Sequence, residues 1–222
     1  MKFQLKDYKH GWVLLYMIIY FTWFILLEQR DDVHFTNVYC KIDDYIPFLE
    51  IFVIPYILWF FYIAITVLYL LFVSSEDFYK CTAFLFIGMT ICLIIYTIWP
   101  NEQNLRINTF PRNNIFTKVI NMLYTTDTST NVCPSIHVYN SIGVHIAIWR
   151  CERLKKHPLI RYGSLVLMIL ICLSTMFIKQ HSFIDFVCGI LLAGVMYILV
   201  YRLWDKWECL FHINKGKIKT ST

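Results

Sequence analysis

Three ionisable side chains stand near the starts of two apolar stretches of the chain, and their types suit acid–base and nucleophilic chemistry. His137 lies at the start of the stretch 135–149, and His181 and Asp185 lie at the start of the stretch 183–204. Ionisable residues inside membrane segments cost about 2.5 to 3.5 kcal/mol each on insertion scales, so a functional role is their default interpretation. These three residues are the candidate catalytic groups.

The spacing of His181 and Asp185 is that of neighbours on one helix face, because residues at i and i+4 lie one turn apart. The carboxylate can then accept a ring N–H and fix the tautomer, which leaves the other ring nitrogen as a nucleophile or base. Helix N-termini favour anions, so two helix starts that meet at a pair of histidines suit a phosphate. A single histidine is more often a hydrogen-bonded core residue, but the convergence favours phosphoryl chemistry.

Asn140, Ser141 and His145 follow His137 at helical offsets and give that stretch a polar stripe facing the bundle interior. Hydrogen bonding between helices is the favoured interpretation of the stripe, and pocket lining is the alternative.

Composition indicates the kind of element that must position these residues. The chain has 222 residues, of which 58% are hydrophobic and 16% charged, whereas soluble proteins average roughly 45–50% apolar and about 25% charged residues. A soluble globule is therefore excluded. Apolar stretches recur at residues 11–27, 46–73, 78–99, 135–149, 159–178 and 183–204.

These lengths predict transmembrane helices, since a span needs about 20 apolar residues and backbone polar groups must be satisfied internally in lipid. The expected fold is all-α: a six-transmembrane-helix bundle in which residues 1–222 form a single integral membrane domain. Trp12, Trp99, Trp149 and Trp204 lie at the expected span ends, as the aromatic belts at membrane interfaces predict.

The Lys and Arg residues orient this bundle, because basic loops are retained on the cytoplasmic side. More of the 20 basic residues fall on the side of the two termini than on the other, so the N- and C-termini are expected to be cytoplasmic and the candidate site extracytoplasmic. Such a site favours the plasma membrane of a bacterium. The basic residues form no continuous face, so nucleic acid is not an expected partner.

Two outward-facing connections are longer than simple turns. Residues 28–45 are acidic and are interpreted as a solvated loop. Residues 100–134 contain apolar side chains at helical spacing, which predict a short amphipathic helix on the membrane surface; they are Ile115, Phe116, Val119, Ile120 and Leu123.

The eight cysteines show no CxxC or zinc-type spacing. Cys40 and Cys133 are expected on the same side of the membrane; two free thiols are favoured, and a disulfide between them is the alternative. No carboxylate cluster accompanies the candidate site, so neither a metal nor another cofactor is expected.

Two runs resemble signatures of a known family. The run Pro-Ser-Ile-His at 134–137 is similar to the Pro-Ser-Gly-His signature of the type 2 phosphatidic acid phosphatase superfamily, and His-x-x-x-Asp at 181–185 is similar to the end of its Ser-Arg-x5-His-x3-Asp signature. The resemblance covers residues 96–205, which it implies to be the catalytic core. It implies that His181 is the nucleophile that attacks phosphorus, Asp185 its orienter and His137 the general acid.

The remaining signature positions of the family are only partly matched. Arg106 is the candidate phosphate clamp, although Ile107 stands at the family's Pro position and Trp99 at its Lys position. Thr175 replaces the usual Arg of the third signature, so the phosphate must be neutralised by fewer or different cations. Further predicted phosphate contacts are Ser135, Lys179 and Arg112.

These departures, with Ile136 in place of Gly, make the chain more similar to the inositolphosphotransferase and sphingomyelin synthase branch of the superfamily than to its standard phosphatases. The expected function is a lipid phosphate phosphatase that acts through a phosphohistidine intermediate on a phosphomonoester or pyrophosphate lipid. The first alternative is a phosphotransferase that moves a phospho-head group to an alcohol. Alternatives of another class are a transporter, in which the three residues relay protons, and a non-enzymatic scaffold.

Overall fold

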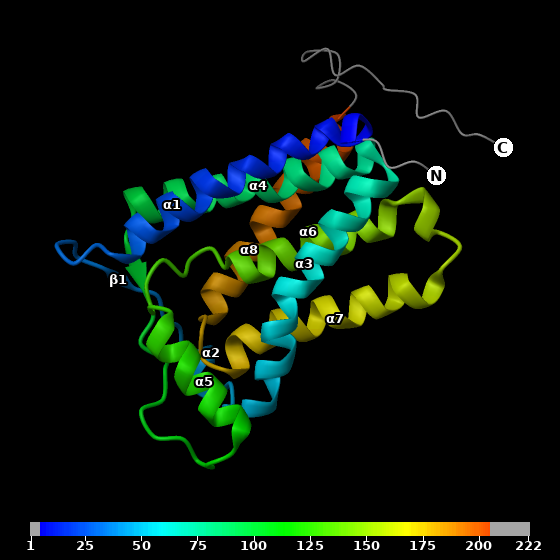
Figure 1. Cartoon of the computed structure of the whole chain (residues 1–222). Coiled ribbons are helices and arrows are strands. Elements are labelled where there is room, and N and C mark those ends of the chain that lie inside the picture. Colours follow the sequence, from blue (N-terminus) through cyan, green and yellow to red (C-terminus); the bar gives the residue numbers. More distant parts are fainter. Residues whose placement is uncertain (1–4, 205–222) are drawn as a thin grey trace.

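The structure is a computed structural model that describes residues 5–204, and it is 73% helix and 3% strand. The helices are α1 (Tyr16–Glu28), α2 (Ile42–Tyr45), α3 (Val53–Val73), α4 (Ser75–Ile98), α5 (Ile115–Thr126), α6 (Ile136–Arg150), α7 (Pro158–Phe177) and α8 (Phe183–Tyr197). Short helical segments of other types are Leu5–Leu15, Glu50–Phe52, Glu152–Leu154 and Ile198–Arg202, and the strands are β1 (Thr36–Asn37) and β2 (Asn101–Glu102). Figure 1 shows a helical bundle with α6 in its middle.

Five helical segments within residues 5–204 are long and apolar enough to cross a membrane. They are Tyr8–Glu28, Glu50–Val73, Ser75–Ile98, Pro158–Phe177 and Phe183–Arg202. A helix of 20 residues spans about 30 Å, which is about the thickness of the hydrocarbon core. The chain is thus an integral membrane protein, as composition predicts.

The remaining predicted span, 135–149, corresponds to α6, which has 15 residues and is about 22 Å long at 1.5 Å per residue. This length is below that of a full span, so the predicted count of six is not confirmed. Helices α3, α4, α7 and α8 all contact α6, and most of its residues are buried. Because neighbouring helices surround it, α6 can carry polar residues that a lipid-facing helix would not tolerate.

Close approach of α4 and α6 depends on two glycines. A Cβ atom on Gly88 would lie 2.0 Å from Cζ of Tyr139, and one on Gly143 would lie 2.4 Å from the ring of Phe84. The rings of Phe84 and Tyr139 stack at 4.9 Å between centroids. Each aromatic ring therefore fills the space that the missing side chain of the opposite glycine leaves, which fixes α6 in the bundle.

The segment before α6 is held by the outer loops. Strands β1 and β2 pair in parallel, and Oδ1 of the buried Asn101 in β2 accepts the backbone N–H groups of Val132 and Cys133, at 2.9 and 2.8 Å. Asn131 donates from Nδ2 to Glu28 at 2.6 Å and accepts from Arg30 at 3.2 Å. The end of α1 thus fixes the polypeptide that leads into α6.

Other expectations for the outer connections have mixed outcomes. The predicted amphipathic helix is present as α5. The interpretation of residues 28–45 as a solvated loop is wrong for Asp43, which is 1% exposed in α2. Cys40 and Cys133 are free thiols in the structure. The basic tail after Asn214 and the first four residues lie outside the described residues.

Candidate active site

His181 and Asp185 meet at the start of α8. Ser182 caps this helix: its hydroxyl accepts the N–H of Ile184 at 3.1 Å, and its own N–H donates to Oδ2 of Asp185 at 2.9 Å. The same Asp185 oxygen lies 3.3 Å from Nδ1 of His181. Asp185 is fully buried and His181 is 7% exposed, so the carboxylate orients the imidazole away from bulk water.

His137 approaches from the start of α6, where Ser135 is the capping residue and accepts the N–H of Val138. Nδ1 of His137 lies 3.4 Å from Nε2 of His181, and the two ring centroids are 5.5 Å apart. Tyr56 and Trp59 of α3 flank the His137 ring, with centroids 4.6 and 4.2 Å away. The structure therefore brings His137, His181 and Asp185 together from two helices.

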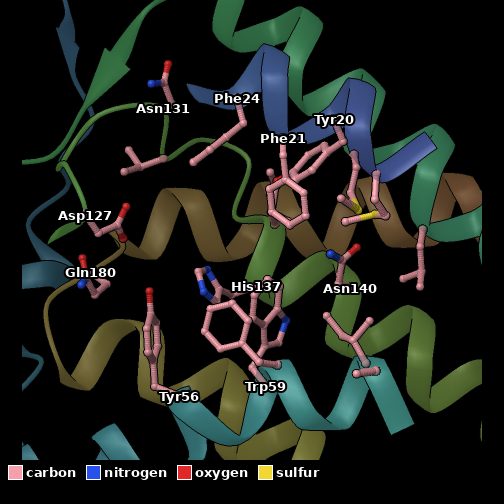
Figure 2. A pocket seen from close by; sticks show the side chains of 18 of the residues that line it. Tyr20, Phe21, Phe24, Tyr56, Trp59, Asp127, Asn131, His137, Asn140 and Gln180 are labelled. Carbon is pink, nitrogen blue, oxygen red and sulfur yellow. The ribbon is translucent and has the colours of Figure 1, made fainter. Parts of the chain in front are cut away.

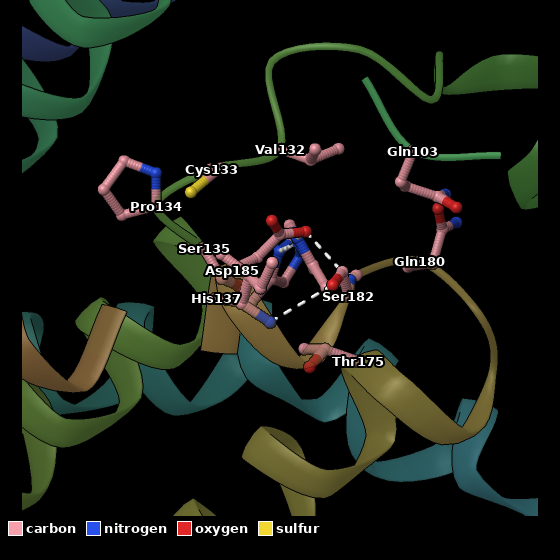
Figure 3. Close-up of polar contacts among 12 residues, drawn as sticks. Gln103, Val132, Cys133, Pro134, Ser135, His137, Thr175, Gln180, Ser182 and Asp185 are labelled. Atoms are coloured by element: carbon pink, nitrogen blue, oxygen red, sulfur yellow. Dashed lines mark hydrogen bonds and ion pairs between the residues drawn. The ribbon is translucent and has the colours of Figure 1, made fainter. Parts of the chain in front are cut away.

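Two contacts hold the starts of α6 and α8 beside each other. The N–H of Ser135 donates to the backbone carbonyl of Asp185 at 3.1 Å. Gly189 lies one turn further along α8, and a Cβ atom there would come within 2.9 Å of the Ser135 carbonyl oxygen. Figure 3 shows His137, Asp185 and Ser182 converging below the segment that contains Cys133 and Pro134.

Arg106 lies close to these residues but is surrounded by oxygen acceptors of the protein. Its guanidinium donates to the backbone carbonyls of Tyr124, Asp127 and Thr128 and, at 2.7 Å, to Oε1 of Gln180. It also lies over the Tyr124 ring, 4.9 Å from the centroid. Burial lowers the pKa of Arg106. The guanidinium is therefore linked to the histidine pair by its hydrogen bond to Gln180, the residue before His181.

The other predicted phosphate contacts have different surroundings. Lys179 donates to the carbonyls of Asp43 and Ile46, at 3.0 and 2.6 Å, and burial lowers its pKa. Arg112 forms an ion pair with Glu50 at 3.0 Å. The structure thus brings Ser135 beside the histidines, whereas the amine and guanidinium of Lys179 and Arg112 have protein partners on other segments.

Residues 108–209 match the PAP2 superfamily model. No curated protein and no solved structure matches the chain. The match to the PAP2 superfamily includes His137, His181 and Asp185 and begins two residues after Arg106. Members of that superfamily are typically phosphatases or phosphotransferases.

Asp43, which no sequence pattern indicated, lies outside the matched residues 108–209 but contacts the start of α8. Its carboxylate accepts the Ser182 hydroxyl at 2.8 Å, the Phe183 N–H at 2.7 Å and the Cys40 N–H at 2.9 Å. Asp43, Asp185 and the Ser182 hydroxyl thus occupy the first N–H groups of α8. The N–H groups at the start of α8 therefore already have acceptors within the protein.

Thr175, which stands at the usual Arg position of the family signature, also positions His181. Its carbonyl accepts the backbone N–H groups of both Gln180 and His181, at 2.9 and 3.0 Å. Its hydroxyl donates to the Cys172 carbonyl inside α7. No sequence motif marks Asp43 or Gln180, because their roles depend on contacts between distant segments.

A cavity of about 690 Å³ opens beside His137 and His181. Most of its wall is apolar and comes from α1, α3 and α4, and its polar end contains Gln180, Asp127, Thr128, Thr130 and Asn131. Figure 2 shows Asp127 and Gln180 at one side of His137, and Tyr20, Phe21 and Phe24 of α1 above it. The cavity therefore combines a polar end at the histidines with room for hydrocarbon.

Charges near the polar end are mixed in sign. Burial raises the pKa of Asp127, as does the nearby Glu28 carboxylate, whereas Arg106 acts in the opposite direction. Among residues 5–204, no group of three or more His, Cys, Asp or Glu side chains is placed to hold a metal ion.

Proposed function

We propose that the chain is a membrane-embedded lipid phosphate phosphatase that acts through a phosphohistidine on His181. The observation that carries this proposal is the short contact between Nε2 of His181 and Nδ1 of His137, 3.4 Å, with Asp185 on the opposite ring nitrogen of His181. A nucleophile oriented by a carboxylate and facing a second acid–base group is the arrangement that covalent catalysis needs. The PAP2 superfamily match supports the same chemistry.

In the first step, the lone pair on Nε2 of His181 attacks phosphorus. The new N–P bond forms while the bond from phosphorus to the lipid oxygen breaks, and that oxygen keeps the electron pair and takes a proton from His137. Asp185 accepts the Nδ1–H of His181 and stabilises the positive charge that develops on the ring. The products of this step are a phosphohistidine and a lipid alcohol.

In the second step, water attacks the phosphohistidine. Its oxygen forms the new bond to phosphorus, its proton passes to His137, and the N–P electron pair returns to Nε2 of His181. Phosphate leaves and both histidines regain their starting protonation. The net reaction converts a lipid phosphate and water into a lipid alcohol and phosphate.

Substrate binding must move the two rings apart. Reacting atoms in a near-attack geometry are about 3–3.5 Å from each other, and a phosphorus with its leaving oxygen must fit between the ring nitrogens. The observed separation of 3.4 Å between the two ring nitrogens is too short to hold both atoms. Because His137 is sandwiched by Tyr56 and Trp59 rather than hydrogen-bonded to them, we assign the movement to the His137 ring.

We assign the phosphate contacts to the start of α6, with the Ser135 hydroxyl, since the N–H groups at the start of α8 already have acceptors. Arg106 contributes positive charge from behind Gln180. Lys179 and Arg112 act by holding neighbouring segments, through the carbonyls of residues 43 and 46 and through Glu50.

A phosphotransferase is the second candidate function, and the apolar wall of the cavity favours it. A lipid alcohol that enters this space can replace water in the second step, and the atoms balance in the same way. Purified protein given a labelled lipid phosphate, with and without a lipid alcohol, distinguishes the two reactions. Free phosphate as the sole labelled product supports the phosphatase, whereas a new labelled phospholipid supports the transferase.

The same assay tests enzymatic function against transport or a scaffold role. We expect His181→Gln to abolish release of labelled phosphate while membrane insertion stays normal. Unchanged turnover in this variant would remove His181 as the nucleophile, and no turnover in the unsubstituted protein with any lipid phosphate would remove the proposed function.

We also propose that the site faces the extracytoplasmic side, because the basic residues favour cytoplasmic termini. Cys40, which is partly exposed near α2, reports on this orientation. An impermeant maleimide applied to intact cells is expected to label Cys40 in a variant that lacks the other cysteines. Labelling only after the cells are permeabilised would reverse the orientation.

A further inference from the structure

Three buried polar side-chain atoms of residues that line the cavity have no hydrogen-bond partner. One is Nε2 of Gln180, and the other two are Oδ1 of Asn140 on α6 and Nε1 of Trp59 on α3. Asn140 is 2% exposed. Buried polar atoms in native proteins nearly always have partners, and each one without a partner costs stability, so these atoms require an explanation.

Hydrogen bonds within the protein do not account for the Asn140 oxygen, although they account for its polar neighbours on α6. Ser141 donates to the His137 carbonyl at 2.6 Å, and His145 bonds Ser164 of α7 at 3.0 Å. The predicted hydrogen bonding between helices is therefore confirmed for His145, whereas the Ser141 hydroxyl bonds within α6. Asn140 is the member of the stripe whose side-chain oxygen is left for a ligand.

The position of Asn140 and Trp59 links them to the chemistry. Asn140 lies three residues after His137 and therefore on the same helix face, and the Trp59 ring lies 4.2 Å from the His137 ring between centroids. In Figure 2, Asn140 lies on one side of His137, and Gln180 and Asp127 lie on the other. The two atoms thus lie next to the proposed general acid, on the side away from Gln180.

We propose that Asn140 and Trp59 form a subsite for the alcohol part of the substrate, and this proposal rests on the proposed function. His137 protonates the leaving alcohol oxygen, so the alcohol carbon chain must begin beside His137. The indole N–H needs an acceptor and the Asn140 oxygen needs a donor. One group that supplies both is a hydroxyl or an amide.

The substrate class that fits is therefore a lipid phosphate with a hydroxyl or amide group close to its phosphorylated carbon. A simple alkyl or isoprenyl phosphate leaves both protein atoms unpaired, and a site that has buried polar groups rejects ligands that leave those groups unpaired. In a reaction through a phosphohistidine, an incoming alcohol takes the place that the leaving alcohol vacated. The same subsite then selects the acceptor of the transferase reaction.

The test compares phosphate release from two lipids: a monoacylglycerol phosphate, which has a free hydroxyl beside the phosphorylated carbon, and hexadecyl phosphate, which has none. We expect the unsubstituted protein to prefer the first lipid in kcat/KM. Asn140→Leu is expected to reduce this preference about tenfold, equivalent to about 1.4 kcal/mol, and Trp59→Phe to act in the same direction. An unchanged ratio in Asn140→Leu would overturn the proposal.

A stability measurement separates this proposal from a purely structural role. Because Asn140→Leu removes a buried atom without a partner, we expect the melting temperature of the ligand-free protein in detergent to rise by about 2–4 °C, the shift for about 1 kcal/mol in a chain of this size. Thr66→Val is the matched control on α3, since its buried hydroxyl already donates to the Tyr62 carbonyl at 2.8 Å. This variant is expected to leave the lipid preference unchanged and not to raise the melting temperature.

A binding measurement keeps this proposal distinct from the proposed function. Monoacylglycerol, which carries no phosphate, is expected to raise the melting temperature of the unsubstituted protein more than that of Asn140→Leu. If no lipid phosphate is turned over but this difference is present, the proposed function fails and the subsite remains. If turnover is present and the difference is absent, the subsite fails alone.

Discussion

Helices α6 and α1 both border the cavity but are built in opposite ways. Helix α6 is short, contacts four neighbouring helices and carries His137 at a start that is tied to α8 by the Ser135 N–H. Helix α1 is apolar, packs mainly on α4 and buries only Tyr20 and Leu27. The difference indicates that the bundle interior fixes the candidate catalytic groups, and it supports the proposal that the lipid-facing wall receives the substrate.

The largest expected effect comes from a substitution in α6. His137→Ala removes the proposed general acid and is expected to lower kcat for a lipid phosphate by about 100- to 10,000-fold. A nitrophenyl phosphate has a leaving group that needs no proton, so its turnover is expected to fall far less. His157→Ala, an exposed histidine at the start of α7, is the control. Equal losses with both substrates would contradict the assignment of His137.

The contact between α6 and α8 gives the next largest effect. Gly189→Ala adds a Cβ atom that would lie 2.9 Å from the Ser135 carbonyl, which forces the two helix starts apart. Misplacing catalytic groups by about 1 Å can cost about 100-fold in rate, and overpacking costs about 1–3 kcal/mol in stability.

Gly194 of the same helix provides the control for this substitution, because a Cβ atom there meets nothing within 4 Å. Gly194→Ala is expected to keep full activity, measured as phosphate release together with thermal unfolding. If Gly189→Ala were as active and as stable as Gly194→Ala, the close contact would not position the site.

A smaller loss of activity is expected from a substitution of Asp43, which supports the start of α8. Asp43→Asn removes the negative charge of the carboxylate that accepts hydrogen bonds from the Ser182 hydroxyl and the Phe183 N–H. Charge-assisted hydrogen bonds of this kind contribute about 1.5–3 kcal/mol each, and a partial loss of His181 positioning is expected to lower kcat about tenfold with little change in KM. The neighbouring Asp44 is exposed and bonds Tyr39, so Asp44→Asn is the matched control. A change in KM alone would show that Asp43 does not act through the start of α8.

The smallest expected effect comes from the lipid-facing wall. Ala64→Trp on α3 fills part of the cavity and is expected to raise KM for a long-chain lipid phosphate about fourfold, the factor for losing burial of about one CH₂ group. Ile65→Trp changes the neighbouring residue, which is 65% exposed and outside the cavity lining. A soluble short-chain phosphate is expected to show no change with either variant. Equal effects of the two substitutions on the lipid would argue against the cavity as the lipid site.

Much of the helical framework follows from the sequence, because each long apolar stretch has to form a helix in lipid. The bounds of α4 and α7 agree with the predicted spans to within about three residues, in keeping with the usual uncertainty of helix ends. Helix α5 was predictable from the periodic apolar residues of its amphipathic face. Helix α6 was predicted as well, as a full transmembrane span, but its burial by four neighbouring helices was not.

The site was predictable where the relevant contacts are local. The four-residue spacing of His181 and Asp185 places them on one helix face, and the structure has them 3.3 Å apart. Contacts between distant segments were not predictable: Asp43 reaches Ser182 across 139 positions of the chain, and Arg106 is held by the carbonyls that follow α5. The proposed roles of Arg106, Lys179 and Arg112 depend on those contacts.

The central claim is that His181 carries the phosphoryl group, and trapping the intermediate tests it most directly. Protein mixed briefly with a lipid labelled in its phosphate, quenched in alkali and digested, is expected to yield a peptide with acid-labile label on His181. His137→Ala is expected to retain some label, and His181→Ala to retain none. Label that is stable in acid, or that lies on another residue, would contradict the account.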